Sequence, residues 1–203
     1  MKAIVRTHYG PPDVLRFTEV EKPAPKDNEV LIKLYAASVN PLDLFHLRGA
    51  PLIRLIPGQR TPKHQVLGCD IAGRVEAIGA HVTQFQPGDE VFGVTGFAGG
   101  GFAEYACAIE DKLALMPANS SFEDAAAVPI AAITALQGLR DKGHIQPGHK
   151  VLVDGASGGV GTFAVQIAKS FGAEVTAVCS TRNVDTARSI GNQIGRASCR
   201  ERV

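Results

Sequence analysis

Short runs of hydrophobic residues, broken by Gly and Pro, fill the first part of the chain. Six runs have the composition and length of β-strands: Lys2–Thr7, Glu29–Ser38, Leu67–Ile78, Glu90–Val94, Phe102–Ala108 and Lys112–Met116. Turn-forming residues separate them, as in Gly10-Pro-Pro12 and Pro87-Gly-Asp89. Many short strands separated by turn residues predict a β-barrel or a β-sandwich over residues 1–118.

The pattern changes to that of helices after Pro117. Ser120-Ser-Phe-Glu123 resembles a capping box at a helix start. The alanine-rich run Asp124–Asp141 is typical of a helix, and Pro129 predicts a break inside it. We therefore expect a β-rich domain over residues 1–118 and a second, α/β domain over residues 119–193.

The second domain opens on a glycine motif between a predicted strand and a predicted helix. The apolar run that starts at Val151 leads into Ala156-x-Gly158-x-x-Gly161, the helical pattern Val160–Phe171 follows, and a second strand is predicted at Glu174–Cys179. This order is that of the first βαβ unit of a dinucleotide-binding fold. The expected roles are a tight turn at Ala156, diphosphate contacts through the backbone N–H groups of Ser157, Gly158, Gly159 and Val160, and close helix packing at Gly161.

The residues after the second predicted strand bear on the choice of cofactor. NAD-binding folds usually carry an acidic residue there, which binds the ribose 2′-hydroxyl. This chain has Ser180, Thr181 and Arg182 instead. Hydroxyls and a guanidinium can bind a 2′-phosphate, which predicts NADPH rather than NADH. The alternative is that Ser180 and Thr181 cap the next helix and that Arg182 is solvated.

Only two strands of the expected parallel sheet are visible, whereas such a sheet has about six. The last ten residues, 194–203, show neither strand nor helix periodicity, and they can be encoded by DNA that resembles a sequencing adaptor. We hypothesise that this tail is an assembly artefact, which in-frame continuation of the underlying DNA would refute. We expect this shortened chain to be marginally stable and inactive by itself.

Composition excludes several classes of protein. A formal net charge of +1 gives no reason to expect a nucleic-acid partner or an anionic membrane. No run of 18 apolar residues is present, and the N-terminus does not resemble a signal peptide. The four cysteines have no paired spacing, so we expect a cytoplasmic protein.

The order of the motifs resembles the medium-chain dehydrogenase/reductase superfamily, in its quinone oxidoreductase (zeta-crystallin-like) and enoyl reductase branch. The resemblance extends over residues 1–191. It rests on the glycine motif and on Val39-Asn-Pro-Leu-Asp43, Leu67-Gly-Cys-Asp-Ile-Ala-Gly-Arg-Val-Glu-Ala-Ile-Gly79, Pro87-Gly-Asp-Glu-Val91, Gly101-Phe-Ala-Glu-Tyr105, Ala125-Ala-Ala-Val-Pro129 and Thr134-Ala-Leu136. It implies an α/β protein with an N-terminal GroES-like β-barrel, an incomplete Rossmann domain, and a homodimer for the full-length protein.

The resemblance implies catalysis without a metal. Where the zinc-dependent branch has a Cys ligand, this chain has Asn40, and where that branch has a His-Glu pair, it has Cys69-Asp70. No third ligand is well placed, whereas catalytic zinc needs three protein ligands. We therefore expect no zinc, and we interpret Cys69 as a small buried residue.

The same resemblance places three residues near the nicotinamide. Asn40 and Asp43 are implied to lie at the nicotinamide and substrate cleft, with the Asn40 amide as a hydrogen-bond donor and Asp43 as an orienting group. The alternative for this segment is a turn with an Asx cap, and both roles can hold together. Thr134 is implied to approach the cofactor; its alternative is a hydroxyl bonded within its own helix. Phe45 stands where the family commonly has Tyr, so general acid catalysis by that residue is absent.

Three functions follow as hypotheses. The first is a zinc-independent, NADPH-dependent oxidoreductase that reduces quinones or α,β-unsaturated carbonyls by hydride transfer to a small-molecule substrate. The second is a zinc-type alcohol dehydrogenase, and the third is an NADPH-binding protein without catalytic activity. Activity without metal, chelator-sensitive alcohol oxidation, and binding without turnover would distinguish them.

Overall fold

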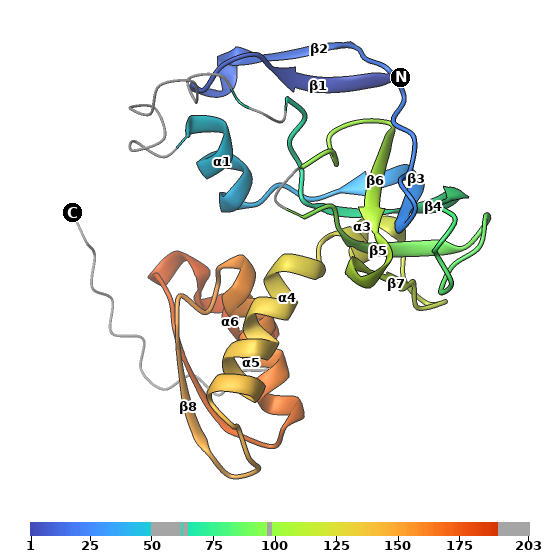
Figure 1. Ribbon diagram of the computed structural model, residues 1–203. Helices are drawn as coiled ribbons and strands as arrows, with labels where there is room; N and C mark the ends of the chain where they lie inside the picture. Colours follow the sequence, from blue (N-terminus) through green and yellow to red (C-terminus); the bar gives the residue numbers. More distant parts are fainter. Residues whose placement is uncertain (50–61, 63–64, 97–98, 191–203) are drawn as a thin grey trace. The chain divides into compact units, whose positions relative to one another are not determined.

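The computed structural model describes residues 1–49, 62, 65–96 and 99–190. The chain divides into two compact units, Met1–Pro129 and the part from Ile130 onward (Figure 1). The predicted boundary at residue 118 lies before this division. The helix α3 (Phe122–Ala126) packs against strands of the first unit, so the segment after residue 118 still belongs to that unit.

The first unit is built from antiparallel strands. They are β1 (Lys2–Arg6), β2 (Leu15–Glu19), β3 (Glu29–Ala37), β4 (Asp70–Ile78), β5 (Glu90–Val94), β6 (Tyr105–Ile109) and β7 (Leu113–Leu115). β1 and β2 form a hairpin, while the other strands form a five-stranded sheet in the order β6-β3-β4-β5-β7. Short 3₁₀ turns occupy Pro12–Val14 and Glu110–Lys112, and α1 (Pro41–Arg48) follows β3.

The alternation that predicted the strands also builds the core of this sheet. Val30 and Ile32 of β3, Ile71 and Val75 of β4, and Val91 of β5 form one buried cluster. Gly73 lets β3 and β4 approach closely, because a Cβ at this position would lie 2.2 Å from the Lys33 carbonyl oxygen. The register of β3 against β4 shifts at two irregularities, which bend the sheet.

Two features of the first unit differ from the sequence-based expectation. Strand β2 has no predicted counterpart, because most of its residues are exposed and Phe17 is 72% exposed, so no alternation marks it. The capping box was predicted one residue too early: the cap is Ser121, whose Oγ accepts from the Asp124 N–H at 3.1 Å. The Ser121 Oγ also donates to the Asp124 carboxylate, which fixes this register.

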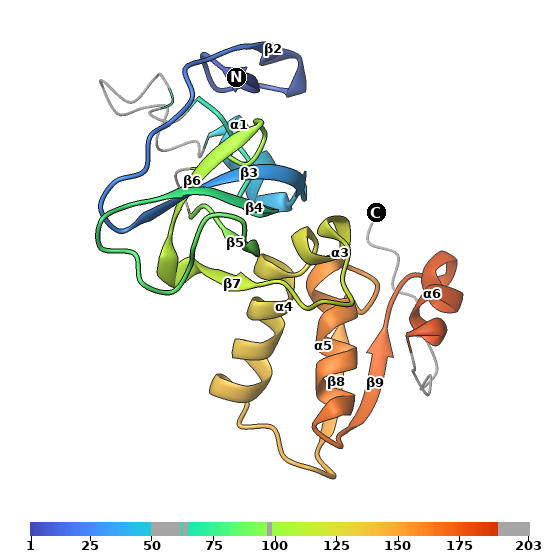
Figure 2. The ribbon, with the colours of Figure 1, turned by 90° about the vertical axis from the view of Figure 1, so that its right-hand side faces the viewer.

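The second unit contains a βαβ arrangement (Figure 2). Its elements are α4 (Pro129–Leu136), a π-helical turn at Gln137–Lys142, β8 (Lys150–Asp154), α5 (Gly159–Ser170), β9 (Glu174–Val178), a 3₁₀ turn at Thr181–Asn183 and α6 (Val184–Ser189). β8 and β9 pair in parallel, from Lys150 opposite Glu174 to Asp154 opposite Val178. A parallel pair needs a crossover, and α5 is that crossover.

The α5 helix packs one apolar face on the two parallel strands. Val165 and Ala168 of α5 are fully buried against Val153 of β8 and Val175 of β9. The strand ends nearest the glycine turn are the carboxyl ends of β8 and β9, which are where ligands bind in open α/β sheets. The fold therefore places Ser157 and Ser180, which follow β8 and β9, at the same edge.

Candidate functional site

The glycine turn between β8 and α5 is held by backbone hydrogen bonds. The Ala156 N–H donates to the Val178 carbonyl of β9 at 3.0 Å, and the Gly158 N–H donates to the Gly155 carbonyl at 2.9 Å. Gly155 has φ +75°, which the sequence analysis did not single out. The left-handed residue of the turn is therefore Gly155, while Ala156 lies fully buried beneath it.

The glycines of the motif have different steric surroundings. A Cβ on Gly161 would lie 2.1 Å from the Gly155 carbonyl oxygen and 2.8 Å from the Ala156 Cα. A Cβ on Gly158 would lie 3.3 Å from the Gly155 oxygen, and one on Gly159 would have no atom within 4 Å. Gly161 is thus required by packing, a Cβ at Gly158 would make a tight contact, and Gly159 leaves open space in front of the turn.

The N-terminus of α5 presents backbone donors to that open space. Gly158 is the N-cap, and the Thr162 N–H donates to the Gly158 carbonyl at 2.9 Å. The N–H groups of Gly159, Val160 and Gly161 precede this first helical hydrogen bond, so they are the orphan donors of a helix start. Together with the helix dipole they are suited to an anion such as a diphosphate.

The predicted ribose-binding residues follow β9 in a 3₁₀ turn. Ser180 is the N-cap of this turn, and its side chain makes no capping hydrogen bond. Ser180, Thr181 and Arg182 are exposed. The structure adds a residue that sequence reasoning missed: the Asn183 Nδ2 donates to the Ser157 Oγ at 3.0 Å. No local pattern marks this pair, because the two residues are 26 positions apart.

The other predicted group lies in the first unit, at the start of α1. Asn40 is the N-cap, and its backbone N–H donates to the Asp43 Oδ2 at 2.8 Å. The Asn40 Nδ2 donates to the Ser38 Oγ at 3.1 Å and to the Asp70 Oδ2 at 3.0 Å. The Ser38 Oγ donates in turn to the same Asp70 oxygen. Both N–H groups of the Asn40 side chain thus have acceptors within the protein.

Two buried carboxylates anchor this network. Asp70 is fully buried and Asp43 is 3% exposed. The second Asp43 oxygen accepts from the Gly68 N–H at 3.2 Å, which ties α1 to the start of β4. Asp43 therefore orients its neighbours through hydrogen bonds to backbone groups, and its side chain faces the protein interior.

Cys69 precedes Asp70 in the chain and is itself 2% exposed. Burial, followed by the charge of Asp43 and a hydrogen bond to it, raises the pKa of the Cys69 thiol to about 12. The thiol is therefore protonated at neutral pH and is unreactive as a nucleophile. This agrees with its interpretation as a small buried residue.

The surface beside Asn40 is apolar. Val39 is 81% exposed and Phe45 is 56% exposed, and Leu44 is also exposed. His46 is half-buried, and its pKa is lowered by burial and then by the nearby Arg6 charge. The Arg6 guanidinium donates to the His46 carbonyl, which holds the last turn of α1 against β1.

The predicted residues are thus distributed over both units. Asn40 and Asp43 belong to the first unit, whereas Thr134, the glycine turn and the 180–182 segment belong to the second. Thr134 lies on α4 with an exposed side chain. Within the second unit, the structure brings the glycine turn and the 180–182 segment together through the bond between Ser157 and Asn183.

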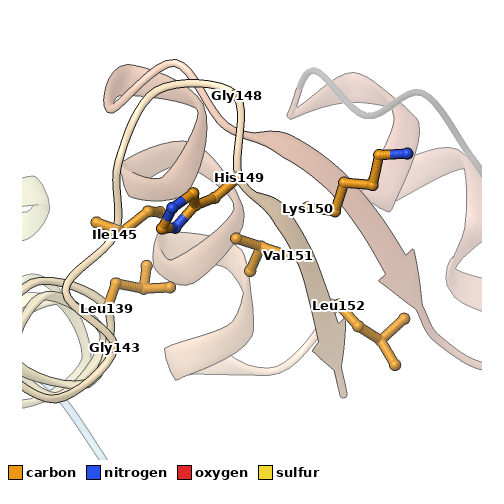
Figure 3. Close-up of a pocket in the computed structure, with 8 residues that line it drawn as sticks. All are labelled: Leu139, Gly143, Ile145, Gly148, His149, Lys150, Val151 and Leu152. Carbon is orange, nitrogen blue, oxygen red and sulfur yellow. The ribbon is translucent and has the colours of Figure 1, made fainter.

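A shallow groove of about 610 Å³ lies elsewhere in the second unit. Figure 3 shows Leu139, Ile145 and His149 gathered on one side of it, with Val151 of β8 facing them. The groove borders the start of β8, at the opposite end of the strand from the glycine turn. Ligands of open α/β sheets bind at the carboxyl ends of the strands, so this groove at the amino end of β8 is not the candidate site.

Neither a metal cluster nor a membrane helix is found in the described part of the chain. Across residues 1–49, 62, 65–96 and 99–190, no group of three or more His, Cys, Asp or Glu side chains could hold a metal ion. No helix within the same ranges is long and apolar enough to cross a bilayer.

Comparison with known proteins identifies the family. Residues 26–118 match the model of the alcohol dehydrogenase GroES-like domain. A quinone oxidoreductase of Sus scrofa is 40% identical over 186 residues, which are 89% of this chain and 53% of the relative. The chain belongs to the medium-chain dehydrogenase/reductase superfamily. The resemblance to its quinone oxidoreductases is confirmed, and the chain spans about half the length of this relative.

Solved structures confirm the fold class. The quinone oxidoreductase from Coxiella burnetii superimposes with a TM-score of 0.86 at 35% identity, covering 96% of this chain and 61% of that one. The Escherichia coli quinone oxidoreductase complexed with NADPH gives a TM-score of 0.80 at 29% identity, covering 96% and 57%. The chain thus combines a GroES-like domain with the beginning of a Rossmann-like parallel sheet.

Proposed function

We propose that this chain is the N-terminal part of a zinc-independent, NADPH-dependent oxidoreductase that reduces quinones or α,β-unsaturated carbonyls. The observation that carries the proposal is the glycine turn at the N-terminus of α5. Its free space in front of Gly159, and the orphan N–H groups of the helix start, fit the diphosphate of a dinucleotide. When bound, the nicotinamide supplies a hydride.

The preference for NADPH rests on the segment after β9. Ser180, Thr181 and Arg182 are exposed at the same edge as the turn, and no carboxylate stands among them. A guanidinium and hydroxyls bind a 2′-phosphate through charge-assisted hydrogen bonds, whereas a carboxylate would repel it. The Escherichia coli quinone oxidoreductase that this chain resembles was solved in complex with NADPH.

The residues at the start of α1 are proposed to shape the substrate side. Asp70 and Ser38 hold the Asn40 side chain, and Asp43 ties the helix start to Gly68, so the site is rigid before substrate binds. The exposed apolar side chains of Val39 and Phe45 can contact a flat, apolar quinone or enone. Phe45 has no O–H group, so it binds substrate and transfers no proton.

The side chains available as ligands do not favour a zinc ion. Zinc prefers thiolate, imidazole or carboxylate ligands. Asn40 offers an amide that already donates to Ser38 and Asp70. Cys69 and Asp70 alone fall short of the three protein ligands that a catalytic zinc needs, which supports a metal-free reaction.

The test is an activity assay of the complete gene product. The protein is mixed with NADPH or NADH and a panel of small quinones and enones, with and without a chelator. Turnover that favours NADPH and resists the chelator is expected. Chelator-sensitive alcohol oxidation would instead favour an alcohol dehydrogenase, and cofactor binding without turnover would favour a binding protein. The homodimer and the cytoplasmic location stay predictions, to be tested by sedimentation and by localisation of a tagged protein.

A further inference from the structure

The hydrogen bond between Asn183 and Ser157 connects the two parts of the proposed cofactor site. Ser157 belongs to the glycine turn, and Asn183 ends the 3₁₀ turn that carries Ser180, Thr181 and Arg182. The distance from the Asn183 Nδ2 to the Ser157 Oγ is 3.0 Å, in a partly buried position. The backbone N–H of Asn183 also donates to the Ser180 carbonyl at 2.9 Å. Asn183 thus closes the 3₁₀ turn through its backbone and binds the glycine turn through its side chain.

The Asn183 side chain makes this contact in place of a helix-capping hydrogen bond. Asn183 is the N-cap of α6, and an asparagine there ordinarily accepts a hydrogen bond from the helix backbone, worth about 1 kcal/mol. Its side chain makes no such bond here. The side chain is turned toward Ser157 instead, so the residue forgoes a local stabilising contact for a long-range one.

The direction of the hydrogen bond determines what Ser157 can do. The Asn183 amide nitrogen is the donor, so the Ser157 oxygen is the acceptor. A serine hydroxyl that accepts in this way keeps its own hydrogen for another partner. The turn in front of it is the one that fits a diphosphate, which needs donors.

We propose that Asn183 is a positioning residue of the cofactor site: it orients the Ser157 hydroxyl as a donor to the diphosphate and holds the 180–182 segment against the glycine turn. This inference rests on the proposed function, because it takes the dinucleotide as the ligand. It assigns a role to a residue outside the glycine motif and outside the segment that faces the ribose.

The experiment measures binding of ADP-ribose and of its 2′-phosphate by calorimetry to the complete gene product. These probes carry the diphosphate and the adenosine ribose without the nicotinamide. In Asn183→Asp, a carboxylate would accept from the Ser157 hydroxyl, so the contact persists while its direction is reversed. We expect ADP-ribose to bind about tenfold more weakly, the size of one lost hydrogen bond to a charged group. Amide exchange over residues 150–178 should stay as in the wild type.

Three further variants separate this role from simple charge repulsion. Thr186→Asp adds the same charge on the exposed side of α6 without reaching Ser157, and its affinity should stay within about twofold of the wild type, since screened surface charges interact weakly. In a Ser157→Ala background, the Asn183→Asp substitution should weaken binding at least threefold less than it does in the wild type. Asn183→Ala, which removes the donor without adding charge, should also weaken binding.

The outcomes distinguish the inference from the proposed function. If the wild-type chain binds ADP-ribose and Asn183→Asp binds it equally well, the positioning role is refuted while the cofactor assignment stands. An Asn183→Asp loss of the same size in the Ser157→Ala background would also refute it, because the substitution would then act without Ser157. If the wild-type chain binds neither probe, the cofactor assignment fails.

Discussion

Replacing Gly161 with alanine tests the packing of the glycine turn. A Cβ there would lie 2.1 Å from the Gly155 oxygen, 2.8 Å from the Ala156 Cα and 2.9 Å from the Gly155 carbonyl carbon. All three atoms are backbone, and the turn that holds them is fixed by the bond from Gly158 to Gly155. The helix and the turn must therefore separate, because no flexible side chain can move aside.

The magnitude follows from two destabilising effects and one stabilising effect. Overpacking of this kind costs about 1–3 kcal/mol, and loss of the Gly158–Gly155 hydrogen bond adds about 1 kcal/mol. The better helix propensity of alanine offsets at most about 1 kcal/mol. We expect a net loss of about 2 kcal/mol in the free energy of unfolding, or about 10 °C in the melting temperature of a unit of this size.

The matched control is Gly159→Ala, two residues away at the first position of α5. No atom lies within 4 Å of a Cβ at this position, so the stability should be unchanged or rise by up to about 1 kcal/mol. The assay is amide hydrogen exchange of peptides from residues 150–178. The three tyrosines lie in the first unit, and the chain has no tryptophan, so tyrosine fluorescence reports on the first unit and should not change. Equal exchange in the two variants would refute the packing argument.

Three other substitutions test the two candidate regions. The folded protein holds the Cys69 thiol protonated to a higher pH than the unfolded chain does, because its pKa is raised to about 12. The stability that this thiol contributes is therefore present below about pH 9 and is lost as the pH rises toward 12, so Cys69→Ala should weaken the pH dependence of urea unfolding between pH 9 and 11. An unaltered pH dependence would contradict the buried-thiol argument. Asp70→Ala removes the carboxylate that accepts from both the Asn40 amide and the Ser38 hydroxyl, and we expect a loss of about 2 kcal/mol in the urea stability of the first unit; wild-type stability would show that the network contributes little. Arg182→Ala in the complete gene product should raise the KM for NADPH about tenfold and leave that for NADH within about twofold; equal changes for both cofactors would argue against a 2′-phosphate contact.

Much of the fold follows from periodicity. The runs that predicted Glu29–Ser38 and Glu90–Val94 as strands match β3 and β5, because buried residues on one face of a sheet impose alternation. The same reasoning could not find β2, whose residues are nearly all exposed. It also placed the α3 cap at Ser120, because consecutive serines offer two registers and only the three-dimensional context selects Ser121.

Part of the candidate site could likewise be predicted from the sequence, and part could not. The glycine spacing located the turn, since each position of the motif has its own steric requirement, but the positive φ at Gly155 depends on the turn geometry and was not foreseen. The family resemblance implied that Asn40 and Asp43 lie near the nicotinamide; the structure shows that they are hydrogen-bonded to each other and adds Ser38 and Asp70 as partners. Such long-range hydrogen bonds leave no periodic signal in the sequence. The predicted adaptor-like tail, residues 194–203, lies outside the described residues.

The central claim is that the turn before α5 binds the diphosphate of a nicotinamide dinucleotide. Its most direct test is a titration of the ¹⁵N-labelled complete gene product with the 2′-phosphate of ADP-ribose, followed by NMR of the backbone amides. The account predicts saturable shifts at residues 157–161 and 180–183. Shifts confined to the groove between Leu139 and Leu152, or none at the glycine turn at saturating ligand, would contradict it.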